Sequence, residues 1–128
     1  DTIQPALKKQ AYNFKSYRQN FIKNIDSIIT PVFYQLQQRY EASLLGVNIV
    51  QSVKSGTGVF TIQGKFFSSS LKITCAGFSK INIDITFQRN NELIDSKRIT
   101  LEASEIEQGI LNDIMEQFLL EYKNKERV

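Results

Sequence analysis

The sequence predicts an α+β domain in which amphipathic helices flank an antiparallel β meander. Residues 5–45 and 104–123 place apolar side chains every three or four positions, which is the period of a helix. The segment between them alternates apolar and polar residues with the two-residue period of strands. The chain has 128 residues, 41% hydrophobic and 23% charged, so it is long enough to bury a core as one domain over residues 1–128.

The N-terminal segment carries a continuous apolar stripe. Arg18 occupies the single polar position in this stripe, whose apolar members are Leu7, Ala11, Phe14, Phe21, Ile25, Ile28 and Val32. The stripe is wide and aromatic, which favours a helix lying on a sheet or in a bundle over a two-chain coiled coil. Because proline breaks the helical hydrogen-bond pattern, we expect either helices over residues 5–28 and 31–45 or one helix kinked at Pro31. Gly46 is expected to end this helical segment.

Five strands are predicted, at about residues 47–53, 59–67, 71–76, 80–88 and 93–101. The glycines in 54–58 favour a hairpin turn, and residues 68–70 are interpreted as a loop. The strand over 80–88 alternates most regularly. The last strand has apolar residues on both parities, which is typical of a central strand, a bulge or a partly covered outer face. Short connections favour an antiparallel meander.

The final helix is predicted at about residues 104–123, packed on the sheet. Ser104 and Glu107 have the spacing of a capping box, which would begin the helix at Ser104. Gly109 within this helix costs about 1 kcal/mol relative to alanine.

The available chemistry is narrow. The chain has no histidine and one cysteine, so histidine-based catalysis and cysteine- or histidine-rich metal sites are excluded within it. We assign no catalytic, cofactor-binding or metal-binding residue, and we predict a non-enzymatic protein. Cys75 shares its parity with Leu71 and Ile73, which predicts a core position. A two-residue turn at residues 90–91 would place Asp84 opposite Lys97 as an ordinary ion pair.

The sequence contains no run of about 18 apolar residues, so we predict no membrane span. A lone cysteine makes a cytoplasmic location the default expectation. Charge is unevenly distributed along the chain. Residues 1–101 have a positive net charge, and residues 102–128 have a negative net charge. This asymmetry is typical either of a basic face for an anionic partner or of an acidic helix beside a basic one.

The leading functional hypothesis is a binding or assembly module that engages a protein partner or a second copy through apolar surface. The apolar surface of the chain is larger than one sheet face can bury. It comprises the two helix stripes and the strand residues Phe67 and Leu93, whose place in the alternation predicts that they face outward. An alternative is nucleic-acid binding by Lys8, Lys15 and Arg18, which interleave with tyrosines on the first helix. A cup for a small ligand, or a carboxylate-dependent enzyme, is a second alternative.

Overall fold

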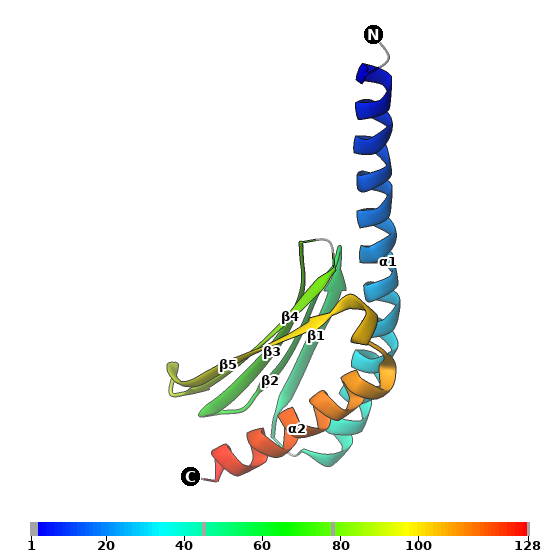
Figure 1. Cartoon of the computed structure of the whole chain (residues 1–128). Helices are drawn as coiled ribbons and strands as arrows, with labels where there is room; N and C mark the ends of the chain where they lie inside the picture. Colours follow the sequence, from blue (N-terminus) through cyan, green and yellow to red (C-terminus); the bar gives the residue numbers. More distant parts are fainter. Residues whose placement is uncertain (1–2, 45, 78, 128) are drawn as a thin grey trace.

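The computed structural model describes residues 3–44, 46–77 and 79–127, with side chains from residue 17 onward. It shows a five-stranded antiparallel sheet with one helix before it and one after it in the chain (Figure 1), which confirms the predicted α+β class. The elements are α1 (Ile3–Ser43), β1 (Asn48–Lys54), β2 (Thr57–Gln63), β3 (Phe67–Ala76), β4 (Lys80–Arg89), β5 (Glu92–Glu102), the short 3₁₀ helix η1 (Ala103–Glu105) and α2 (Gln108–Glu126). The strands follow one another in chain order across the sheet.

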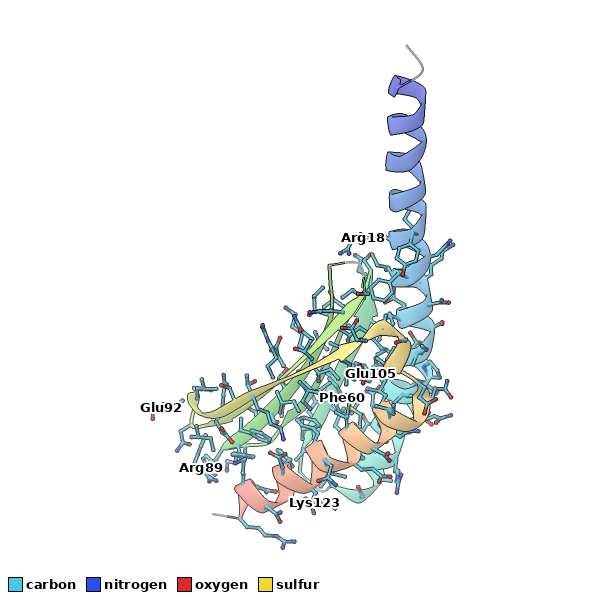
Figure 2. All side chains as sticks on the ribbon, in the orientation of Figure 1. Arg18, Phe60, Arg89, Glu92, Glu105 and Lys123 are labelled. Atoms are coloured by element: carbon cyan, nitrogen blue, oxygen red, sulfur yellow. The ribbon has the colours of Figure 1, made fainter. Side chains whose placement is uncertain are left out.

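Both helices pack on the same face of the sheet, which we call the inner face. Phe60 of β2 lies at the centre of this core and is fully buried (Figure 2). Its ring makes T-shaped, edge-to-face contacts with the rings of Phe33 and Tyr40 from α1 and with that of Phe118 from α2. These aromatic pairs join the sheet to both helices.

Helix α1 runs without a break through Pro31, so the prediction of two separate helices is wrong and the alternative of one helix holds. Proline removes one helical hydrogen bond. The residues around it compensate, because Ile29, Val32 and Phe33 are buried against the sheet. Thr30 also donates its hydroxyl to the Asp26 carbonyl at 2.7 Å. Tertiary packing therefore outweighs the local preference to stop.

The N-terminal part of α1 projects past the end of the sheet (Figure 1). Arg18 marks the point where contact with the sheet ends, since its guanidinium donates to the Gly77 carbonyl in the turn after β3. Figure 2 places Arg18 at the level of that turn. The polar member of the apolar stripe thus lies at the sheet boundary, and residues 3–17 extend about 20 Å beyond it at 1.5 Å per residue.

The connection between β2 and β3 differs from the prediction. Residues 68–70 lie inside β3 rather than in a loop, and Gly64 begins the turn. A Cβ at Gly64 would lie 2.6 Å from the Phe67 carbonyl oxygen, so only glycine fits there. Ser69 points inward and is accommodated because it donates to the Thr86 carbonyl at 2.9 Å. Phe67 begins β3 on the inner face and is 3% exposed, so its predicted outer position is wrong.

The turn between β4 and β5 has the predicted two residues, Asn90 and Asn91, both at positive φ. The pairing of β4 with β5 shifts register close to this turn, between Phe87 and Gln88 of β4. This bulge moves the pairing by one residue, so Asp84 lies opposite Arg98 and not opposite Lys97 as predicted. The Arg98 guanidinium donates to Asp84 at 2.6 Å. The bulge leaves Ile94 unpaired and puts Leu93 on the outer face, whereas Ile99 and Leu101, which share its parity, face inward. Of the three predicted alternatives a bulge is therefore present, and a central strand is wrong because β5 is at the edge of the sheet.

Helix α2 begins at Gln108, not at Ser104. The predicted capping box of Ser104 and Glu107 is wrong. The box is formed two residues earlier, on η1, where Glu105 accepts the backbone N–H of Glu102 at 3.0 Å. Ile106 is buried and leads into α2, so the chain makes a separate 3₁₀ turn before the helix starts.

Candidate assembly surface on the first helix

An apolar hollow lies where α1 leaves the sheet, between α1 and η1. It has a volume of about 460 Å³. Its lining is mainly apolar and comes from two segments far apart in the sequence: Tyr17, Phe21, Ile25 and Ile28 of α1, and Ala103 and Ile106 around η1, with Asn20, Asn24 and Ser104 at its border. Tyr17 is 55% exposed at the end nearest the projecting segment. The hollow is open to solvent and adjoins residues 3–17.

The residues that adjoin the η1 wall of this hollow in the sequence are acidic. Glu102, Glu105 and Glu107 are all exposed, although none of them lines the hollow itself. Glu105 uses one carboxylate oxygen to cap the Glu102 N–H, which fixes the turn. Among the described side chains, no salt bridge to these three carboxylates is found. Three carboxylates therefore adjoin the η1 wall of the hollow in the sequence.

The projecting segment has the opposite charge. Residues 3–17 contain Lys8, Lys9 and Lys15 and no acidic residue. By helical register, Leu7, Ala11 and Phe14 continue the stripe that Phe21 and Ile25 bury against the sheet. The same molecule thus contains a basic amphipathic segment and, at its base, an apolar hollow whose η1 residues are flanked in sequence by glutamates.

The other residues predicted to have functional roles are not brought together. Lys8 and Lys15 lie in the part of α1 whose side chains are outside the described set. The guanidinium of Arg18 is already bonded to Gly77, which leaves it less available to a phosphate. Leu93 is 60% exposed on the outer face of β5, where the prediction placed it, whereas Phe67 is buried on the inner face.

Cys75 and Asp84 form no catalytic arrangement. Cys75 points inward and is half-buried against the core, as predicted from its parity. Burial raises the pKa of its thiol, the Asp26 carboxylate raises it further, and Arg18 opposes them. A raised pKa leaves less of the reactive thiolate. Asp84 lies on the outer face with Arg98. No group of three acidic or cysteine residues that could hold a metal is found in the described part of the chain.

Sequence reasoning missed the hollow itself. The stripe on α1 was visible, but Ala103 and Ile106 on the opposite wall lie more than 70 positions after the last α1 residue of the hollow, Ile28. Only the meander brings them there, through the hydrogen bond from the Ala103 N–H to the Ser79 carbonyl. The acidic residues between positions 102 and 107 were visible in the sequence and could have drawn attention to the η1 side of the hollow.

Comparisons with known protein families, with curated proteins and with solved structures gave no match. No helix in the described residues is long and apolar enough to cross a membrane.

Proposed function

We propose that this protein is a non-enzymatic assembly module that pairs with a second copy of itself through α1. The observation that carries the proposal is the projection of residues 3–17 beyond the sheet with the apolar stripe still in register. A helical segment of this length is marginal in water when nothing packs on it. A partner that covers the stripe would stabilise it.

The occupant is a second copy because one chain carries both halves of the interface. Two α1 helices packed antiparallel about a two-fold axis would lay each projecting segment along the base of the other helix. The Leu7–Phe14 stripe of one copy would then enter the hollow of its partner beside Tyr17 and Phe21. Such an arrangement buries two identical contacts at once.

Charge supports the same pairing. In this arrangement Lys8 and Lys15 of one copy approach Glu102 and Glu107 of the other. Opposite charges across an interface steer association and fix its register. The lysines that suggested nucleic-acid binding thus have protein anions as partners. A cytoplasmic location remains a prediction from the lone cysteine.

Sedimentation equilibrium of the whole chain at low salt tests the apolar contact. We expect a concentration-dependent dimer. The double variant L7E/F14E should raise the dissociation constant of this dimer at least about tenfold, since each substitution buries a charge in an apolar contact. S16E is the matched control, because residue 16 lies on the opposite side of the helix by register. A wild-type chain that stays monomeric at high concentration contradicts the proposal, as does equal association of all three proteins.

Reversing the charges on the two proposed contact surfaces tests whether the partner is a second copy of this chain. K8E/K15E makes both surfaces of one chain acidic, and E102K/E107K makes both surfaces of another chain basic. Each variant alone should dimerise poorly, whereas an equimolar mixture should form heterodimers, because every contact is then between opposite charges. If the mixture associates no better than the separate variants, the antiparallel pairing is wrong. Binding of generic DNA or RNA by a monomeric wild type would instead support the alternative function.

A further inference from the structure

The outer face of the sheet, which no helix of the described residues covers, contains a second hollow. Its volume of about 510 Å³ lies within the range of small-molecule sites. It spans β2, β3 and β4 at the end of the sheet near the Gly64 turn. The side chains that line it include Thr61, Gln63, Ser68, Ser70, Thr86 and Gln88.

These side chains form a regular grid. Thr61, Ser70 and Thr86 lie opposite one another on successive strands, and Gln63, Ser68 and Gln88 form the next row. Neighbouring strands are about 4.8 Å apart and alternate residues about 7 Å apart, so the hydroxyl and carboxamide groups have fixed spacings. The Thr61 and Ser70 hydroxyls lie 3.3 Å apart. Strands in the middle of a sheet hold such groups more rigidly than loops do.

Every described side chain that lines the hollow is neutral, and hydroxyls and carboxamides each both donate and accept hydrogen bonds. An ordinary solvated face carries many lysines and glutamates, as the next row of this sheet does with Lys72, Asp84 and Arg98. A phosphate or carboxylate ligand would find no cation here, and a purely apolar ligand would leave the polar groups unpaired. The matching ligand is neutral and rich in hydroxyls.

An apolar side chain lies beside the hollow. Leu93 is 60% exposed and lies on β5 opposite Gln88, which lines the hollow. Neutral sugars present hydroxyls at the ring edge and C–H groups on the ring face, so a polar floor with one apolar border suits both. We propose that this hollow binds a neutral glycan.

Isothermal titration calorimetry and ¹⁵N NMR with defined probes test this. The probes are cellohexaose, maltohexaose and chitohexaose as free oligosaccharides, and a mannose-rich glycopeptide as a protein-linked glycan. At least one should bind and shift the amides of β2–β4, and the responding probe identifies the source. Polygalacturonate hexamer is the anionic comparison and should bind more weakly.

Isosteric variants locate the site. T61V and T86V should each weaken the binding about fivefold, the effect of one lost hydrogen bond of about 1 kcal/mol. T74V is the matched control on the same face of β3 outside the hollow and should leave binding unchanged. Melting temperatures verify that all three variants fold. No binding of any neutral probe at millimolar concentration would overturn the proposal, and so would binding that T61V and T86V leave unchanged.

Discussion

At the scale of single residues, Tyr40 connects the two helices. Its ring is buried beside Phe60, and its hydroxyl donates to the Met115 carbonyl of α2 at 3.0 Å. This is a long-range polar link in an otherwise apolar contact. Burial raises the pKa of Tyr40 to about 12 from its usual 10.0, with Glu116 adding to the effect and Arg39 opposing it.

We predict that the protein loses stability as pH rises from about 10 to about 12. Because the phenol ionises less readily when folded, its stabilising effect is full below the unfolded pKa and disappears as pH approaches the folded value. Tyr122, whose pKa burial also raises to about 12, acts in the same direction. Urea unfolding across this range measures the decline.

The variant Y40F should lower the free energy of unfolding at pH 7 by about 1 kcal/mol, because one buried hydrogen bond is lost. The alkaline decline should also become shallower. Y34F is the matched control: Tyr34 is on the same helix and 56% exposed, so little change is expected. Equal effects of the two substitutions would show that the Met115 contact contributes nothing.

Two glycines should respond to alanine in opposite directions. G64A should destabilise by about 1–3 kcal/mol, because the new Cβ would meet the Phe67 carbonyl oxygen at 2.6 Å. G109A should stabilise by up to about 1 kcal/mol, since it lies in the first turn of α2 and a Cβ there meets only the Glu107 carboxylate at 3.8 Å. Chemical denaturation of both variants checks the pair, and a shift of the same sign in both contradicts the account.

Residue patterns predicted side-chain direction well where alternation was regular. The inward set of β4 was fully predictable, because Ile81, Ile83, Ile85 and Phe87 share one parity. Phe67 was assigned to the wrong strand, since three serines resemble a loop by composition. Their place in β3 depends on partners on β2 and β4 that no local pattern contains. The same holds for the bulge that moved Asp84 from Lys97 to Arg98.

At the scale of elements, α1 shows packing overriding a local breaker. The sequence alone left open whether Pro31 ends a helix or lies within one. The deciding contacts come from the sheet, where Ile29 and Phe33 lie against Gly58. The candidate hollow was unpredictable for a similar reason, because its two walls come from opposite ends of the chain.

The variant P31A should therefore stabilise the protein by about 1–3 kcal/mol. Alanine restores the N–H that can donate to the Ser27 carbonyl and removes the clash of the proline ring, while the buried neighbours keep their contacts. Thermal and urea unfolding measure the gain. Q38A, at an exposed position of the same helix, should change stability by less than about 0.5 kcal/mol. A loss of stability in P31A would mean that the proline ring itself packs favourably.

At the scale of the whole molecule, the body and the projecting segment differ in what holds them. The body is a closed core in which both helices cover one sheet face. The projecting segment has helical backbone but lies past the sheet. The proposed function implies that its order depends on the second copy. Folding and assembly are then linked, so order in residues 3–17 becomes a function of protein concentration.

Hydrogen exchange measured by mass spectrometry tests this linkage directly. Peptides covering residues 3–17 should exchange rapidly when the protein is diluted well below its dissociation constant and should be protected well above it. Peptides from β3 and β4 serve as the internal control, because a core holds them at both concentrations. Added salt should shift the protected fraction toward that of the dilute sample, since it screens the lysines from the η1 carboxylates. Equal protection of residues 3–17 at both concentrations would show that the helix is stable alone. Marginal helix stability would then give no reason for a second copy.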